Sequence, residues 1–248
     1  MSSYQAFYQR SIEQPEDFWA EEAKLIAWHK PPQQILDFSR PPFARWFCGG
    51  ETNLCYNAVD RYAEKRPDAR ALIFISTETG VEKIYSFAEL KTEVMRMAAV
   101  MQSLGVKRGD RVLIYLPMIA EACFAMLACA RIGAIHSVVF GGFAAASLAT
   151  RIDDAKPLLM GSADAGMRAG KAVPYKHLVD EACTLAKFPP AKVLLVNRGI
   201  DRDMQLVAGR DVDYATLRDQ HLDAEVPIAW LESNEPSYIL YTSGTTGK

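Results

Sequence analysis

The sequence lacks a long hydrophobic run, and this excludes a helix that spans a membrane. The longest apolar stretch, residues 119–130, is interrupted by Glu121, whereas a spanning helix needs about 20 consecutive apolar residues. The N-terminus also lacks a basic start followed by an apolar stretch, so we expect no secretory signal. These absences predict a cytoplasmic protein that does not bind a membrane.

The chain also lacks a surplus of charge of either sign. It has 28 Lys and Arg residues and 30 Asp and Glu residues among 248, which gives a formal net charge of −2. Proteins that bind the phosphate backbone of nucleic acids usually carry a basic surplus, so we expect no nucleic-acid partner. Half of the residues are hydrophobic and 23% are charged, which excludes a disordered or collagen-like chain and predicts one or two globular domains.

Cysteine and histidine are scarce, with five and four residues respectively. No two cysteines form a C-x-x-C pair, and no histidine stands at ligand spacing from Cys48 or Cys55, so we expect no metal site. Cys123 and Cys129 lie in an apolar segment and are expected to fill the core, as is His136. No histidine has partners that indicate acid–base work, so we assign no catalytic residue.

The N-terminal part is expected to begin with a helix from Pro15 that stops before Pro31. Residues 31–50, rich in proline and aromatic side chains, are expected to be irregular and to lie across a larger body. Thr52 or Asn53 can cap the next helix, which should end at Pro67.

From there on, strand and helix patterns alternate. Ser86 and Glu89 form a capping box at the start of a helix that should end at Gly105. Further helices are expected at residues 120–132, 144–155, 175–186 and 214–220, and strands at 71–75, 83–85, 112–116, 135–140, 157–160, 193–196 and 238–241. This alternation predicts an α/β fold with a mostly parallel sheet and flanking helices.

The most informative segment follows the last expected strand. It consists only of hydroxyl residues, glycines and a lysine, namely Thr242, Ser243, Gly244, Thr245, Thr246, Gly247 and Lys248. Glycines let the backbone N–H groups approach a phosphate, hydroxyls add donors, and the ammonium offsets charge. A loop at the carboxyl end of a strand suits such binding, although a flexible polar terminus has the same composition. The segment is not an ATPase P-loop, because Thr242 stands where that motif requires glycine.

The full string at residues 241–248 resembles the phosphate-loop signature of the AMP-forming (adenylate-forming) enzymes. Residues 131–143 and 162–171 resemble the short-chain acyl-CoA synthetases within that family, and the resemblance extends from about residue 7 to residue 248. Residues 41–48 and 230–235 are more similar to propionyl-CoA synthetases than to acetyl-CoA synthetases, and the acetyl-CoA synthetases remain the alternative.

The resemblance implies the N-terminal part of the large domain of an adenylate-forming enzyme. Residues 1–58 would form a helical and irregular extension, and residues 59–248 the first part of the AMP-binding domain. It also implies a ligase that uses ATP with Mg²⁺ to activate propionate and then transfers the acyl group to coenzyme A. These small molecules are the expected partners, and the oligomeric state is not predicted.

By the same resemblance, residues 242–248 would hold the outer phosphates of ATP, with the hydroxyls of Ser243, Thr245 and Thr246 as donors. Coenzyme A would be bound by two segments whose residues are Phe140, Gly141, Gly142, Arg168, Ala169, Gly170 and Lys171. Lys171 stands where the family usually has arginine, so the positive charge is retained but the resemblance does not imply bidentate phosphate binding there. For residues 140–142, a structural turn between strand and helix explains the glycines equally well.

Relatives in this family continue beyond the phosphate loop through the adenine and acyl pockets, the magnesium-binding acid and a mobile C-terminal domain. We therefore expect the 248-residue chain alone to form no acyl-adenylate and to expose apolar sheet surface. A non-catalytic nucleotide- or coenzyme A-binding module is the rival interpretation, and an NTPase is disfavoured by Thr242.

Overall fold

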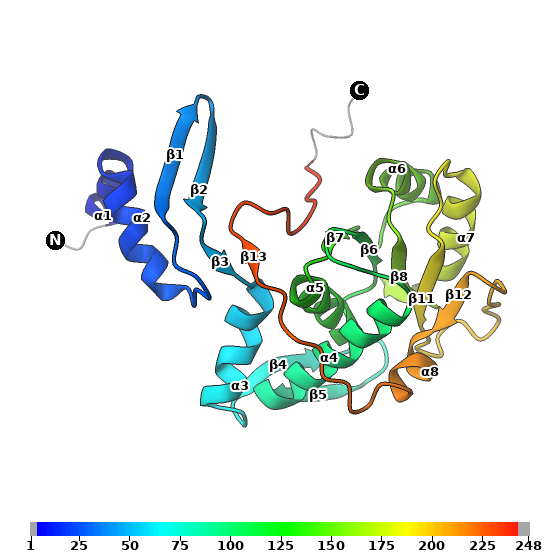
Figure 1. Cartoon of the computed structure of the whole chain (residues 1–248). Helices are drawn as coiled ribbons and strands as arrows, with labels where there is room; N and C mark the ends of the chain where they lie inside the picture. Colours follow the sequence, from blue (N-terminus) through cyan, green and yellow to red (C-terminus); the bar gives the residue numbers. More distant parts are fainter. Residues whose placement is uncertain (1–3, 243–248) are drawn as a thin grey trace.

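The core of the molecule is a five-stranded parallel sheet, seen in a computed structural model that describes residues 4–242 (Figure 1). The strands are β6 (Arg111–Tyr115), β7 (Ile135–Val138), β8 (Leu159–Ala163), β11 (Lys192–Val196) and β12 (Asp211–Asp213). Their spatial order is β12-β11-β8-β6-β7, and every pair is parallel. The expected α/β fold with a mostly parallel sheet is therefore confirmed.

Helices cover both faces of this sheet (Figure 1). One face carries α4 (Phe87–Ser103), α5 (Ala120–Ile132) and α8 (Tyr214–Asp219), and the other carries α6 (Ala145–Ala155) and α7 (Tyr175–Leu185). Alternate residues of β6 point to opposite faces of the sheet. Val112 and Ile114 pack with the hydrophobic residues on the α4, α5 and α8 face, and Leu113 and Tyr115 pack on the α6 and α7 face. A strand buried on both faces explains the continuous apolar run in its sequence.

The chain reverses its direction of winding at β6. Helix α5 leads from β6 to its neighbour β7, and α6 then returns across the other face to β8, which pairs with β6 on the opposite side. In open α/β sheets, ligands bind outside the carboxyl ends of the strands at such a switch point. This topology directs attention to the loops that follow β6, β7 and β8.

The local signals for α4 and α5 are confirmed. The hydroxyl of Ser86 accepts from the Glu89 N–H at 3.2 Å, and the Glu89 carboxylate accepts from the Ser86 N–H at 2.7 Å. Gly105 follows α4 with φ +93°, and α5 ends at Gly133 with φ +74°. Glycine adopts this left-handed conformation without the steric penalty of a Cβ atom.

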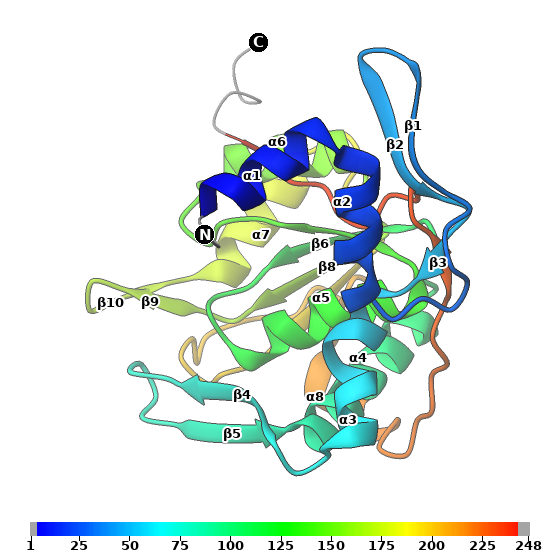
Figure 2. The ribbon, with the colours of Figure 1, turned by 90° about the vertical axis from the view of Figure 1, so that its left-hand side faces the viewer.

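Smaller hairpins surround the sheet. The expected pair β4 (Arg70–Ile75) and β5 (Glu82–Ser86) is confirmed, and β3 (Glu51–Thr52) pairs with β13 (Leu231–Glu232). The sequence did not predict the hairpin of β9 (Gly166–Arg168) and β10 (Lys171–Val173). Figure 2 shows the β4–β5 and β9–β10 hairpins projecting from the same side of the molecule.

The N-terminal part departs most from expectation. Residues 31–50, expected to be irregular, contain an antiparallel hairpin of β1 (Gln34–Arg40) and β2 (Phe43–Cys48). Pro41 and Pro42 lie in its turn, so neither interrupts the ladder of hydrogen bonds. The expected helix from Pro15 ends early, because α2 (Pro15–Glu22) gives way to the short 3₁₀ helix η1 (Ala23–Leu25), and α1 (Tyr4–Glu13) precedes them.

The helix expected between Asn53 and Pro67 is also divided, into the π-helical turn η2 (Tyr56–Asp60) and α3 (Arg61–Lys65). The strand expected at residues 238–241 is only an isolated parallel bridge between Tyr238 and His136. Ile239 donates to the carbonyl of His136 at 2.9 Å, so this segment still runs along the β7 edge.

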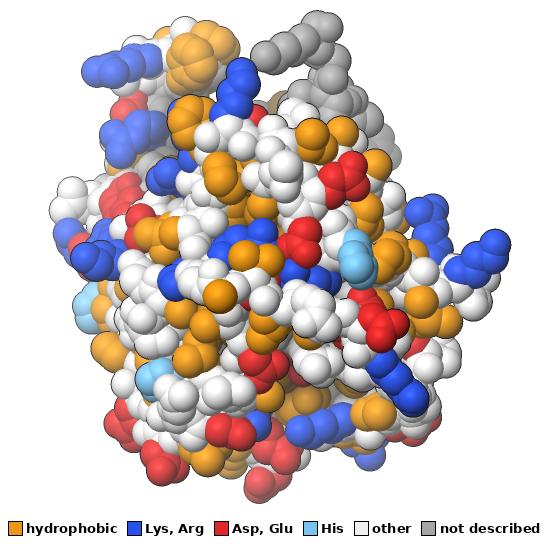
Figure 3. Space-filling model, turned by 90° about the vertical axis from the view of Figure 1, so that its right-hand side faces the viewer, with side chains coloured by type: hydrophobic (Ala, Val, Ile, Leu, Met, Phe, Trp, Pro, Cys, Tyr) orange, Lys and Arg blue, Asp and Glu red, His pale blue; other side chains and the backbone are white. Residues whose placement is uncertain are grey.

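The surface agrees with the balanced charge of the sequence. Acidic and basic side chains are interspersed on the face shown in Figure 3. The β4–β5 hairpin, which is separate from the main sheet, exposes Ile73, Ile75 and Ile84. Helices cover both faces of the main sheet, so whether truncation exposes apolar surface stays a prediction. Within residues 4–242, no helix has the length and apolar character needed to cross a bilayer.

Candidate functional site

Two segments meet at the carboxyl ends of β7 and β8, next to the switch point. The first is a turn at residues 140–143, in which the N–H of Phe143 donates to the carbonyl of Phe140 at 3.1 Å. The second is the β9–β10 hairpin, which follows β8. The guanidinium carbon of Arg168 lies 5.7 Å from the centre of the Phe140 ring, so residues 28 positions apart in the sequence are brought together.

Close approach explains the two glycines in the turn. A Cβ atom on Gly141 would lie 1.7 Å from the hydroxyl oxygen of Tyr175, and one on Gly142 would lie 2.6 Å from Nη1 of Arg168. Both distances are far below van der Waals contact, so neither position accommodates a side chain without movement. The interpretation as a structural turn is therefore supported by geometry, and contact with a ligand remains a prediction.

The hairpin presents two basic residues at its tip. Arg168 and Lys171 are directly opposite each other, and Ala169 and Gly170 form the two-residue turn between them with φ +49° and +76°. Positive φ at both central residues is typical of a type I′ turn, whose twist matches that of the flanking strands. Both basic side chains are exposed, and the Phe140 ring beside them is 62% exposed.

Two buried tyrosines form the floor beneath this turn and hairpin. The rings of Tyr115 and Tyr175 are 4.8 Å apart, and the Tyr115 hydroxyl donates to the carbonyl of Phe143 at 3.1 Å. Burial, with a smaller effect of Tyr175, raises the pKa of Tyr115 to about 12, so it remains a neutral donor. Sequence reasoning missed both tyrosines. The only local signal for Tyr115 is a polar aromatic residue at the end of an apolar strand, and for Tyr175 a polar aromatic residue at the start of a helix.

The expected phosphate loop lies almost entirely outside the described residues, which end at Thr242. The residue before it, Tyr241, is held by α6: its hydroxyl donates to the Asp154 carboxylate, and the Arg151 guanidinium lies 3.8 Å from the centre of its ring. Burial and then the bond to Asp154 raise the pKa of Tyr241 to about 12. The chain that enters the loop is therefore anchored beside β7.

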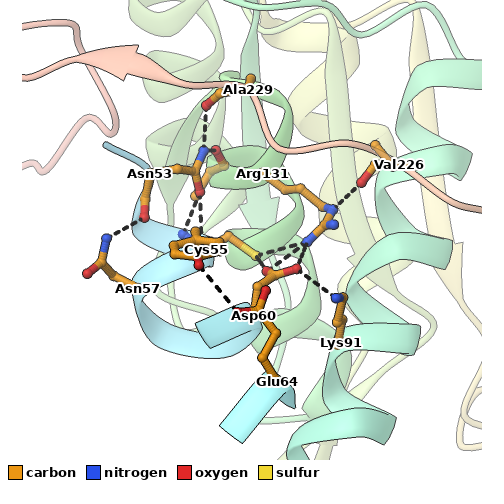
Figure 4. A network of polar contacts seen from close by, with 11 residues as sticks. Asn53, Cys55, Asn57, Asp60, Glu64, Lys91, Arg131, Val226 and Ala229 are labelled. Atoms are coloured by element: carbon orange, nitrogen blue, oxygen red, sulfur yellow. Dashed lines mark hydrogen bonds and ion pairs between the residues drawn. The ribbon is translucent and has the colours of Figure 1, made fainter. Parts of the chain in front are cut away.

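A buried polar network joins the N-terminal segment to the sheet domain (Figure 4). Nη1 of Arg131 lies 3.0 and 2.9 Å from the two carboxylate oxygens of Asp60, and both side chains are 4% exposed. Nε of Arg131 donates to the carbonyl of Val226 at 2.6 Å. Burial and then Asp60 raise the pKa of Cys55 to about 12, so this thiol stays protonated at neutral pH.

Comparison with known proteins gives two family matches. Residues 59–248 match the model for AMP-binding enzymes, and residues 4–58 match the acetyl-coenzyme A synthetase N-terminus. The structure is similar to that of an acetoacetyl-CoA synthetase from Streptomyces lividans, with a TM-score of 0.87 and 28% sequence identity, over 98% of this chain and 37% of the other.

Sequence identity to individual proteins differs between propionate–CoA ligases and an acetyl-coenzyme A synthetase. The chain is 64% identical over 246 residues to a propionate–CoA ligase of Salmonella typhimurium and 63% identical to one of Escherichia coli. Each alignment covers 99% of this chain but only 39% of the relative. Identity to an acetyl-coenzyme A synthetase of Pasteurella multocida is 42%, over 38% of that protein.

Proposed function

Because the chain belongs to the family of AMP-binding enzymes, we propose that it is the N-terminal part of a propionate–CoA ligase. The observation that carries this proposal is its 64% identity to a propionate–CoA ligase, compared with 42% to an acetyl-coenzyme A synthetase. This difference in sequence identity favours propionate over acetate as the substrate.

The proposed reaction has two steps. A carboxylate oxygen of propionate attacks the α-phosphorus of ATP, the bond to the β-phosphate breaks, and propionyl-AMP and pyrophosphate form. The thiol of coenzyme A then attacks the propionyl carbonyl, loses its proton, and displaces AMP to give a thioester. Direct attack on a carboxylate is slow because its leaving group is poor. The mixed anhydride supplies a good one, and the protein contributes positioning and charge neutralisation.

Within this chain, we assign residues 242–248 to the outer phosphates of ATP. Their backbone N–H groups and hydroxyls supply donors where negative charge develops on the leaving pyrophosphate. The anchoring of Tyr241 to α6 supports this role, because it fixes the point at which the segment begins.

We assign the Phe140 turn and the β9–β10 hairpin to coenzyme A. The Arg168 guanidinium suits bidentate contact with a phosphate, and Lys171 adds a second positive charge at the same tip. The exposed ring of Phe140 offers an apolar face beside these charges, and the missing side chain of Gly142 leaves room for the Phe140 ring and the Arg168 guanidinium to lie against the turn. Ala169 and Gly170 act by forming the turn.

Mg²⁺ would accompany ATP. Residues 4–242 contain no group of three or more His, Cys, Asp or Glu residues that could hold a metal ion, so we assign neither a ligand nor a step to it. We also place the enzyme in the cytoplasm, which its five unpaired cysteines favour.

A chimeric enzyme tests the proposal. Residues 1–248 would replace the matching 39% of the Salmonella typhimurium relative. We expect the chimera to catalyse propionate-dependent exchange of labelled pyrophosphate into ATP and to form propionyl-CoA. The 248-residue chain alone should catalyse no exchange.

The rival function is a coenzyme A-binding module without catalysis. It is favoured by one observation, namely that this chain by itself builds both the Phe140 turn and the basic hairpin and brings them together. A chain that binds coenzyme A, together with an inactive chimera, would support this alternative.

A further inference from the structure

The basic hairpin needs support from outside itself. Its two strands have only three residues each, and an isolated two-stranded hairpin is marginally stable in water. All three residues of β9 lie opposite residues of β10, with Arg168 opposite Lys171 next to the turn. In an antiparallel pair, the N–H and C=O groups of the alternate residues, Ala165 and Met167, point away from the partner strand. This leaves an outer edge of β9 for other groups to bind.

Two side chains from distant segments bind that edge. The Glu78 carboxylate accepts from the Met167 N–H at 3.1 Å, and Nη1 of Arg198 donates to the carbonyl of Ala165 at 2.9 Å. Glu78 and Arg198 are also paired with each other through the other carboxylate oxygen and Nη2. Together they satisfy the donor and the acceptor that a third strand would satisfy.

Both side chains are themselves well fixed. The Arg198 side chain is 7% exposed and that of Glu78 is 24% exposed. The fully buried Asp164 carboxylate accepts from the N–H groups of Arg198 and Ile200 at 3.1 and 2.7 Å, which holds the loop that carries Arg198. Glu78 lies in the turn between β4 and β5, where Gly80 donates to the carbonyl of Ser76 at 2.9 Å.

We propose that Glu78 and Arg198 are positioning residues for coenzyme A. They hold the outer edge of β9, so that Arg168 and Lys171 at the hairpin tip face the phosphates of the nucleotide. Neither residue touches the ligand, and this role rests on the proposed coenzyme A site. It also gives the β4–β5 hairpin, which lies outside the main sheet, a function in substrate binding.

The chimera described above provides the test, because its first half-reaction does not use coenzyme A. Glu78→Ala should raise the KM for coenzyme A about tenfold, as expected when a charged hydrogen bond that orients a binding group is removed. ATP–pyrophosphate exchange should remain unchanged. Glu78→Gln keeps an acceptor for the Met167 N–H and should have a smaller effect. Glu82→Ala, which removes an exposed carboxylate from the same hairpin, is the matched control and should have none.

A double variant separates positioning from general damage. Because Glu78 acts through the hairpin tip, Glu78→Ala added to Arg168→Ala should raise the KM for coenzyme A little further than Arg168→Ala alone. An unchanged KM in Glu78→Ala would overturn the inference and leave the proposed ligase intact. Equal losses in both half-reactions would also overturn it, because they indicate a structural role. A chimera with no activity at all would instead refute the proposed function.

Discussion

Gly141 lies so close to the Tyr175 hydroxyl that any side chain there must displace it. We expect Gly141→Ala to cost about 1–3 kcal/mol of the free energy of unfolding, as is usual for overpacking, and to weaken coenzyme A binding. Gly161→Ala in β8 is the control, because its Cβ atom would meet no heavy atom within 4 Å. Urea titrations of both variants provide the measurement. Equal stability of the two would contradict the packing argument.

His136 gives a prediction for the dependence of stability on pH. It lies next to Tyr238, with ring centres 5.8 Å apart, and burial lowers its pKa from the usual 6.5. The unfolded chain therefore binds a proton at this histidine more readily than the folded chain does. The contribution of neutral His136 to the free energy of unfolding is complete above about pH 6.5, and it is lost as the pH falls toward the lowered pKa of the folded state. His136→Gln should lose less stability than the wild type between pH 7 and pH 5 in thermal melts. Parallel curves for the two proteins would show that His136 does not contribute.

At the scale of single elements, the capping box of α4 is the clearest case. Ser86→Ala removes the acceptor for the Glu89 N–H and should cost about 1 kcal/mol of unfolding free energy. Ser103→Ala, at the other end of the same helix, removes only a donor to the Val100 carbonyl and should cost less. The denaturant midpoints of the two variants provide the measurement. A larger loss of unfolding free energy in Ser103→Ala than in Ser86→Ala would contradict the assignment of Ser86 as the N-cap of α4.

The same scale shows what the sequence could and could not predict. Helix α5 was predicted with its observed bounds, because its apolar run is long and Gly133 provides a local stop signal. The β1–β2 and β9–β10 hairpins were missed, since their strands are held by cross-strand pairs and by groups far away in the chain. Arg168 and Phe140 were assigned to coenzyme A by resemblance, and this role stays a prediction, although the structure does bring the two side chains together. The pairing of Glu78 with Arg198, 120 residues apart, leaves no local pattern.

At the scale of the whole molecule, we propose that the chain supplies one part of a larger site. The switch point of the sheet brings together the Phe140 turn and the basic hairpin, and the Tyr241 segment runs along the neighbouring β7 edge. The chain spans 39% of the length of its propionate–CoA ligase relatives. We therefore expect residues 1–248 to need the remaining length of such a relative for catalysis.

The most direct test of the central claim is propionate-dependent exchange of labelled pyrophosphate into ATP by the chimera. We predict exchange at a rate close to that of the Salmonella typhimurium relative, and none by the 248-residue chain alone. A chimera that folds with a cooperative thermal transition but catalyses no exchange would contradict the claim that this chain is the N-terminal part of a propionate-activating ligase.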